Sequence, residues 1–410
     1  MTASLAEGTR LMVEAGPHDR ENIIVRASCG GECGCEGGHS LYESDEAGNV
    51  GAPVPVQCES GCGCSDDDCD CDEEAFGCSD LTWIVPSLKA GERKFYVAAP
   101  ASGDGDCGCG GGCGCGGSGV SINVVPGEKA DILVGGKLFT SYVVKEGIAR
   151  PYCYPVLGPG GAEVTNLAPG DHVHHKSMYV AQGAVNGHDN WSEMPGHAST
   201  VNNDLFALAE GPVYGEIFAI SDWVSASGER LLEELTSITV YNLPDSGRIM
   251  DWDITLSAGY QGVHLGDTKE AGTLSVRVAA SMEVPNGGTI RNSYGGVNDD
   301  ENWGKRAEWV DYYGPVTSGV AGITIMDTPS NLRYPTYWHV RGYGLFTANC
   351  WGIHDFTGDH SKRGDYTLKH GDEVNFKYRV YIHAGDTCAA KVKNKYLDYL
   401  FPPKVTVVSG

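Results

Sequence analysis

The chain has 410 residues, of which 41% are hydrophobic, enough to build a substantial core. It carries 54 acidic and 29 basic residues, a formal charge of −25, so it repels phosphate backbones and anionic lipids. Nucleic-acid and membrane partners are therefore not expected. No run approaches the roughly 20 apolar residues of a membrane span, and the first residues lack a signal-peptide pattern. We expect a cytoplasmic protein.

Short apolar runs bounded by Gly, Pro, Asn and Asp dominate the chain and predict strands. The clearest are Ile23–Val25, Leu81–Val85, Phe95–Ala99, Val120–Val125, Asp131–Val134, Ile217–Ile220, Ile238–Tyr241, Leu274–Ala279, Gly322–Met326 and Phe376–Ile382. Ser227–Leu235 permits a helix but is too short to organise a domain. The pattern predicts a mostly β protein. A small N-terminal β-sandwich over residues 1–118, with Cys/Gly-rich loops, precedes a large antiparallel β-sandwich, similar to a supersandwich, over 119–410.

Cysteine is concentrated in the first domain, which holds 13 of the 16 cysteines. The spacing C-x3-C-x-C occurs three times there and brings three sulfurs close together, as zinc, copper(I) or iron–sulfur sites require. We therefore predict that thiolates bind a metal, zinc or an iron–sulfur cluster, through Cys29, Cys33, Cys35, Cys58, Cys62, Cys64, Cys69, Cys71, Cys78, Cys107, Cys109, Cys113 and Cys115. Disulfide-stapled loops are the alternative. Disulfides would place the protein outside the cell. However, 13 is an odd number of cysteines, so one of them would be left over or pair outside this region.

The densest ionisable cluster of the second domain is Asp171-His-Val-His-His-Lys176. Its imidazoles suit acid–base catalysis near neutral pH, and a divalent metal at His172 and His174 is a further reading. If the segment is a strand, His172 and His174 share one face and His175 points to the other. A polar surface turn is the alternative.

Several segments, in order along the chain, resemble the hallmark segments of the PmoA-like family, also called DUF6807. They are Arg150–Pro155, Gly158–Gly161, Asp171–Lys176, Asn186–Trp191, Gly266–Glu270, Arg277, Asn302–Arg306, Trp309–Gly314, Pro335–Leu345 and Tyr378–Gly385. The resemblance covers most of residues 120–390 and extends to parts of the N-terminal unit. It implies carbohydrate chemistry without assigning a reaction. The chain departs from the family in its Cys loops and at Asn349-Cys-Trp-Gly352, where the family commonly reads Asn-Pro-Phe-Gly.

If these motifs converge on one β face, they form a mostly cationic site for a small, acidic or oxidised sugar. We expect catalytic roles for His172, His175, Lys269, Glu270, His339, Arg341 and Tyr343, and substrate contacts from Lys176, Arg277, Trp303, Lys305 and Asp311. His339, Arg341 and Tyr343 would alternate along one strand face.

Two kinds of carbohydrate enzyme fit this set. In a lyase, a His or Tyr removes a proton beside a carboxyl or keto group, Arg341 or Lys269 stabilises the enolate, and Tyr343 protonates the leaving oxygen. In a glycoside hydrolase, Glu270 and Asp311 would be the paired carboxylates. We favour the lyase or another elimination-type reaction.

The main alternative is a non-catalytic protein on an inherited β scaffold. Its Cys loops would then serve metal storage, cross-linked assembly of identical subunits, or electron transfer through several clusters. An enzyme and a structural protein would respond differently to substitutions. An enzyme loses turnover when His339 or Arg341 is replaced, whereas a structural protein loses assembly when Cys33 or Cys62 is replaced.

Overall fold

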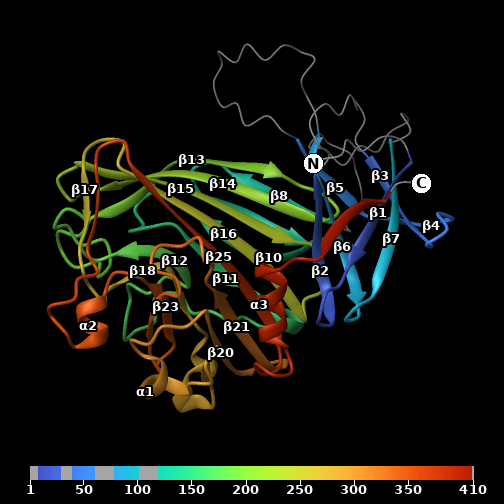
Figure 1. Cartoon of the computed structure of the whole chain (residues 1–410). Helices are drawn as coiled ribbons and strands as arrows, with labels where there is room; N and C mark the ends of the chain where they lie inside the picture. The colour runs from blue at the N-terminus through green and yellow to red at the C-terminus, as the bar shows by residue number, and fades with distance from the viewer. Residues whose placement is uncertain (1–7, 29–38, 61–77, 101–118, 409–410) are drawn as a thin grey trace, which may run out of the picture. The chain divides into compact units, whose positions relative to one another are not determined.

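The computed structural model describes residues 8–28, 39–60, 78–100 and 119–408, and they form a mostly β protein, as the sequence predicts (Figure 1). Two compact units divide the chain. One comprises residues 1–120, 209–214 and 394–410, and the other 121–208 and 215–393. The sequence places a boundary at 118/119, and the first unit additionally takes these two later segments. Within the described ranges, no helix is both long and apolar enough to cross a membrane.

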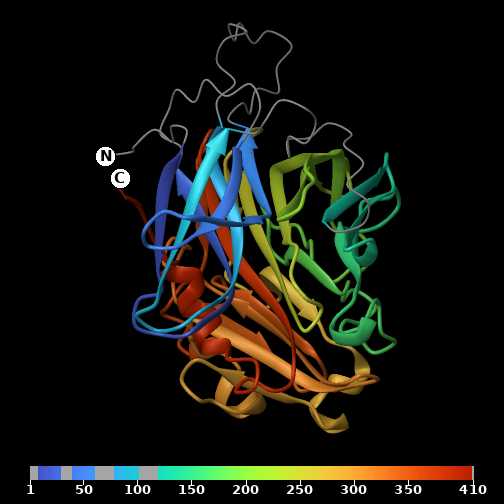
Figure 2. The same ribbon diagram turned by 90° about the vertical axis from the view of Figure 1, so that its right-hand side faces the viewer.

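The first unit is a small sandwich of two sheets (Figure 2). Its five-stranded sheet has the order β26-β1-β7-β3-β4 and its three-stranded sheet the order β2-β6-β5. The strands are β1 (Thr9–Glu14), β2 (Arg20–Ser28), β3 (His39–Ser44), β4 (Val50–Val54), β5 (Val56–Ser60), β6 (Cys78–Leu88), β7 (Arg93–Pro100) and β26 (Lys404–Val408). One core holds both sheets together: Leu11 and Tyr96 from the first pack with Val25 and Trp83 from the second, all at most 2% exposed. This mutual burial of apolar faces explains why the two sheets stack.

The second unit contains two eight-stranded sheets. The first has the order β22-β23-β18-β12-β11-β10-β9-β8. Its strands are β8 (Val120–Val125), β9 (Lys129–Val134), β10 (Lys137–Val143), β11 (Tyr152–Val156), β12 (Met178–Gln182), β18 (Ala271–Arg277), β22 (Tyr337–Val340) and β23 (Leu345–Asn349). We call it the site sheet, because most of the candidate residues lie on or beside it.

The second large sheet has the order β13-β14-β15-β16-β25-β21-β20-β19. Its strands are β13 (Ser199–Ala209), β14 (Tyr214–Val224), β15 (Arg230–Tyr241), β16 (Gly247–Ser257), β19 (Thr289–Asn292), β20 (Trp309–Val316), β21 (Gly319–Met326) and β25 (Glu373–Ala384). It packs on the site sheet through ring contacts between Tyr142 and Trp252, 6.3 Å apart, and between Phe346 and Tyr312, 5.8 Å apart. The unit is therefore a large β-sandwich.

Helices are short and peripheral to these sheets. They are α1 (Asn298–Asn302), α2 (Ile353–Thr357) and α3 (Val392–Leu400), with single 3-10 turns η1 (Pro159–Gly161), η2 (Ala280–Met282) and η3 (Val284–Asn286). Strands β17 (Val263–Leu265) and β24 (Tyr366–Leu368) form a separate pair. The helix-permissive segment Ser227–Leu235 is strand from Arg230 onward, because β15 pairs with β16 along its length and its alternate side chains are buried. Sheet pairing here outweighs local helix propensity.

Candidate functional site

A row of side chains crosses the site sheet on the face turned away from the second large sheet. His339 of β22 lies opposite Thr347 of β23, which lies opposite Ser275 of β18, and Ser275 lies opposite Tyr179 of β12. Directly opposed residues share a face of a sheet. Phe346, the neighbour of Thr347, points the other way and contacts the second sheet. The row therefore forms a floor outside the main sandwich core.

A β-bulge in β18 brings Glu270 to the same face. Tyr179 pairs with Ser275, but Ala181 pairs with Gly272, so β18 uses one extra residue over this stretch. The extra residue reverses the alternation of side chains beyond it, so Glu270 shares the face of Ser275 rather than the opposite one. Its carboxylate acts on the pKa values of four residues around this floor: His174, Tyr179, His339 and Tyr343. Glu270 is thus central to the candidate site.

The three histidines of the Asp171–Lys176 segment meet in a turn, one of the two conformations considered for it, and do not lie on a strand. The His172 amide donates to the Pro169 carbonyl and the His175 amide to the His172 carbonyl, both at 3.0 Å, so two successive turns fold the segment. The rings of His172 and His175 stack with centroids 4.7 Å apart, and the His174 ring lies edge-on to His175 at 4.5 Å. Tyr343 stacks on His172, also at 4.7 Å. All three imidazoles therefore lie together.

Arg277, at the end of β18, holds this cluster in place. It is 2% exposed, and its guanidinium donates to Asp171 at 3.0 Å and to Glu283 at 2.9 Å. It also donates to Nδ1 of His175 at 3.2 Å. Because arginine is always a donor, His175 accepts at Nδ1 and carries its proton on Nε2. Arg277 is therefore a positioning residue whose charge is already matched by two carboxylates.

The electrostatics keep one imidazole neutral and one carboxylate charged. Burial, reinforced by the charges of His174, His172 and Arg277, lowers the pKa of His175 to about 2. Burial alone would raise the pKa of Asp171, but hydrogen bonds from His172 and Arg277 outweigh it and lower that pKa to about 2. Near neutral pH, His175 is an uncharged ring beside an ionised Asp171.

A second buried arginine supports the loop from behind. Arg150 is fully buried and donates to Glu193 at 2.8 Å and to the carbonyl oxygens of His174, Asn190 and Trp191. Lys176 pairs with the same Glu193 at 3.1 Å and donates to the Val173 carbonyl at 2.8 Å. Lys176, a predicted substrate-binding residue, thus stabilises its own loop through these two contacts.

His339 is oriented for proton transfer. Its Nδ1 lies 2.8 Å from the Lys269 carbonyl oxygen, which only accepts, so the ring proton is on Nδ1 and the Nε2 lone pair is free to accept. Burial lowers the pKa of His339 to about 4, and the Glu270 carboxylate counters only part of this effect. The side chain of Lys269 pairs with Glu270. His339 is therefore a neutral imidazole of fixed tautomer near neutral pH.

Arg341 and Tyr343 are not on the strand with His339, contrary to the alternating pattern predicted. Strand β22 ends at Val340, and residues 341–344 form the turn to β23, closed by the Gly344 amide donating to the Arg341 carbonyl at 2.9 Å. Gly344 has φ +105°, which favours glycine and allows the reversal. The turn still places both side chains at the site. Arg341 lies 5.1 Å from the centre of the Trp303 ring, and Tyr343 stacks on His172.

Asp311, a predicted substrate-binding residue, lies elsewhere, in the second large sheet. Asp311 is completely buried in β20, where it accepts hydrogen bonds from Thr324 at 3.0 Å, from His383 at 2.9 Å and from Thr387 at 2.5 Å. It is enclosed by these partners, whereas Glu270 is 43% exposed in its side chain, so the structure does not present the two as paired carboxylates. Lys305 is exposed beyond the end of α1.

Most of the cysteines predicted to bind a metal lie outside the described residues. Only Cys58 and Cys78 of the thirteen fall within the described strands, β5 and β6. In the described part of the chain, no three His, Cys, Asp or Glu side chains are grouped to hold one metal ion. A divalent metal at His172 and His174, whose rings lie 5.6 Å apart edge-on, stays a prediction.

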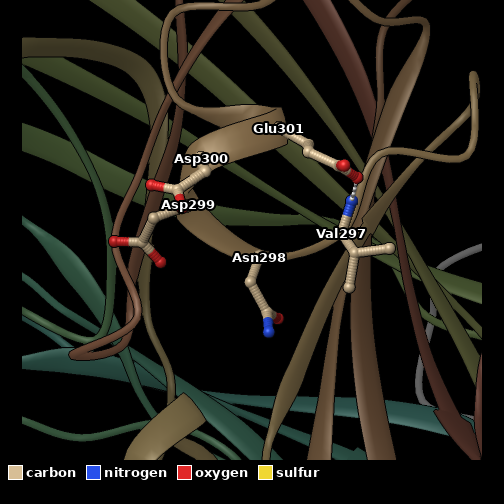
Figure 3. Close-up of a pocket in the computed structure, with 5 residues that line it drawn as sticks. All are labelled: Val297, Asn298, Asp299, Asp300 and Glu301. Atoms are coloured by element: carbon tan, nitrogen blue, oxygen red, sulfur yellow. Dashed lines mark hydrogen bonds between the residues drawn. The ribbon is translucent and has the colours of Figure 1, made fainter.

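An acidic hollow of about 380 Å³ lies at α1. Figure 3 shows the side chains that line it. It is lined by Val297, Asn298, Asp299, Asp300 and Glu301. Part of this lining is committed to backbone contacts, since Glu301 accepts from the Val297 amide at 2.8 Å. A Cβ at Gly342 would lie 2.9 Å from Asp299 Oδ1, so the hollow borders the turn that carries Arg341.

Sequence reasoning missed the residues that hold the site together. Glu193 and Glu283 neutralise Arg150 and Arg277, and Tyr179 supplies the floor. The carboxylates lie in no ligand-like spacing, so nothing local distinguishes them from surface acids. Tyr179 could have been suspected only once β12 and β18 were known to pair.

The family profile described as "Family of unknown function (DUF6807)" matches residues 129–397. This is more than half of the chain, and the chain belongs to this family. The match contains every described site residue discussed above. No curated protein matches the chain.

Two solved structures are similar over the whole chain. One is a protein in the glycosyl hydrolase family 38 from Enterococcus faecalis, with a TM-score of 0.46, 9% identity, and coverage of 100% of this chain and 49% of that chain. The other is an alpha-mannosidase from Enterococcus faecalis V583, with a TM-score of 0.44, 9% identity, and coverage of 100% and 47%. The chain thus spans about half the length of each. Likeness at this level carries no conclusion about activity.

Proposed function

For this member of DUF6807 we propose an elimination-type reaction on a small sugar that carries a carboxyl or keto group, with His339 as the base. The observation that carries the proposal is the fixed tautomer of His339: its Nδ1–H is given to the Lys269 carbonyl at 2.8 Å, so Nε2 accepts. A base must be unprotonated before it acts, and burial keeps this imidazole neutral at neutral pH.

The neighbouring groups supply the other requirements of such a reaction. Burial raises the pKa of Tyr343, so the phenol keeps its proton and can act as an acid. Arg341 provides a positive charge near both, since its charge acts on the pKa values of His339 and Tyr343. Developing negative charge on an enolate is stabilised by a cation already in place.

His339 Nε2 takes the proton from the carbon beside the carboxyl or keto group, and the electron pair of that C–H bond forms an enolate next to Arg341. The enolate collapses to a carbon–carbon double bond, the bond to the leaving oxygen breaks, and Tyr343 protonates that oxygen. Solvent then carries the proton of the imidazolium back to the phenolate, and no oxidant or reductant is needed.

The sugar class rests on the resemblance to the PmoA-like family. Trp303 and Tyr343 are half-buried aromatic residues beside the polar groups, and they contact Arg341 and His172. A hydrolase is less well supported, since the second carboxylate it would need, Asp311, is enclosed by Thr324, His383 and Thr387.

The test is exchange of a carbon-bound hydrogen. The full chain is incubated in D2O with a panel of uronic, aldonic and keto sugars, and deuterium uptake and double-bond formation are followed by mass spectrometry and ultraviolet absorbance. We expect both signals for the wild type and neither for His339→Asn, whose amide retains the donor to the Lys269 carbonyl. Equal turnover by His339→Asn, or no exchange with any sugar, would refute the proposal.

A second proposal, independent of the first, is that the Cys loops bind a metal. Described strands of the first unit end at Ser28, Ser60 and Pro100, before the three Cys-rich segments, and the chain is described again from His39 and Cys78. Register pairs Ser28 with Asp80, Ser60 with Cys78, and His39 with Pro100. The residues that flank the Cys-rich segments therefore lie at one end of each sheet.

The two sheet ends are the same end of the sandwich. Strand β1 starts beside Ala98 and runs away from it, and β2 begins at Arg20, whose side chain donates to the Ala15 carbonyl at the far end. Strand β2 then returns, so its last residue, Ser28, reaches the end where Pro100 lies. We propose that cysteines of the three segments attached at this end share a metal.

Elemental analysis of anaerobically purified protein, with a thiol count on the same sample, tests this second proposal. We expect two or more atoms of zinc, copper or iron per chain, with loss of metal in Cys33→Ser and Cys62→Ser but not in His339→Asn. Absence of metal together with few free thiols would indicate disulfides instead, and the protein would then be expected outside the cell.

A further inference from the structure

Arg341 differs from the other buried and half-buried arginines of the second unit in that its guanidinium has no hydrogen-bond or ion-pair partner among the described residues. Arg150, Arg277 and Arg379 are paired with carboxylates, and Arg333 donates to three carbonyl oxygens. Within the described residues, the Arg341 side chain forms neither a hydrogen bond nor an ion pair. A half-buried guanidinium that donates to no acceptor at all is unexpected in a chain with 54 acidic and 29 basic residues.

The guanidinium is nevertheless fixed in position. It lies 5.1 Å from the centre of the Trp303 ring, and that ring is itself held edge-on by Phe356 at 5.5 Å. Stacking on an aromatic face orients a guanidinium while leaving its N–H donors free. Trp303 thus positions Arg341 and leaves the N–H donors of the guanidinium for a ligand oxygen.

Within the described residues, no carboxylate near Arg341 forms an ion pair with it, including Asp299, Asp300 and Glu301 of the adjacent acidic hollow. Glu270 is paired with Lys269, and Asp299 lies against Gly342 without forming an ion pair to Arg341. His339, which faces the same side, is neutral near pH 7. The free positive charge at this end of the site is therefore that of Arg341.

We propose that Arg341 and Trp303 form a carboxylate-binding subsite, so that the substrate is a sugar acid rather than a keto sugar. The planar guanidinium matches the two oxygens of a carboxylate, which it binds through two parallel N–H donors. This inference rests on the proposed function for its sugar, and it specifies the group beside the carbon from which His339 takes the proton.

Binding to the full chain tests the inference without any need for turnover. The probes are glucuronate, galacturonate and gluconate, with glucose and galactose as uncharged counterparts and glucose 6-phosphate as the competing anion, measured by calorimetry. We expect at least one sugar acid to bind roughly 10- to 100-fold more tightly than its uncharged counterpart, as a charged hydrogen-bonded pair requires. Arg341→Gln removes this preference, Arg341→Lys retains part of it, and Trp303→Phe weakens it several-fold.

The control is Arg363→Gln, which removes the same charge from an exposed arginine paired with Asp365. It should leave sugar-acid binding unchanged, and the thermal midpoints of all variants show that they remain folded. No preference for a sugar acid, tighter binding of the phosphate, or an unaltered preference in Arg341→Gln would each overturn the inference.

The same experiment separates this inference from the proposed reaction. His339→Asn should bind the sugar acid as the wild type does while losing deuterium uptake. If binding depends on Arg341 but no exchange occurs, the subsite stands and the reaction falls. If exchange occurs with keto sugars and sugar acids bind no more tightly than their uncharged counterparts, the reaction stands and the subsite falls.

Discussion

The buried, neutral His175 predicts how the stability of the second unit depends on pH. Its pKa is lowered to about 2 in the folded protein, chiefly by burial, whereas a histidine in an unfolded chain titrates near 6.5. Between these values the unfolded state binds the proton and the folded state does not, so stability falls as the pH falls below about 6.5. One proton corresponds to about 1.4 kcal/mol per pH unit, which amounts to about 2 kcal/mol between pH 7 and pH 5.

The assay is urea unfolding at pH 7, 6 and 5, followed by tryptophan fluorescence. Seven of the eight tryptophans lie in the second unit, Trp83 being the exception, so the signal reports mainly on it. His175→Asn keeps an oxygen that can accept from Arg277 and removes the titrating ring. We expect this variant to lose about 2 kcal/mol less than the wild type between pH 7 and pH 5.

Comparing variants is necessary because another buried group acts in the opposite direction. Burial raises the pKa of Asp327 to about 6, so this carboxyl contributes a stability that increases as the pH falls from about 6 towards 3.8. That contribution is common to all variants and cancels in the difference. His360→Asn, at an exposed ring, is the matched control and should follow the wild type. Parallel pH curves for wild type and His175→Asn would refute the reasoning.

Three further predictions concern the packing around the site. Gly272→Ala should destabilise the protein by about 3 kcal/mol in urea unfolding, because its Cβ would lie 1.8 Å from Thr347 Oγ1, and Thr347→Ala should recover part of the loss. Asp311→Asn should cost about 3 kcal/mol by breaking a fully buried pair with His383, yet leave sugar-acid affinity unchanged in the folded fraction; a selective loss of affinity would contradict its placement. Glu193→Gln should lower stability by about 2 kcal/mol, since Arg150 stays buried with its charge uncompensated; an unchanged midpoint would show that the carbonyl partners suffice.

The positions of many strands could be predicted from the sequence. Each of the apolar runs proposed as a strand lies in or overlaps a strand, because alternating β-branched and aromatic residues fit one buried and one exposed face wherever they occur. The grouping of His172, His174, His175 and Arg277 was also accessible as a hypothesis, since the resemblance to DUF6807 places those motifs together.

What the sequence did not determine is how side chains are directed. The bulge in β18 sets the face of Glu270, and it is visible only in the pairing with β12, where Ala181 meets Gly272. The turn after Val340 takes Tyr343 off the strand and onto His172. Register and turn closure depend on partners distant in the sequence, so local periodicity cannot specify them.

The sequence by itself therefore determined the fold class, the family and the chemical types gathered at the site. Only the tertiary structure decided which charges are already matched. Asp171 and Glu283 neutralise Arg277, His383 encloses Asp311, and Arg341 is left without a partner among the described residues. The reason is physical: charge matching depends on distance and burial, and both are set by segments that meet only when the two sheets and their loops have folded.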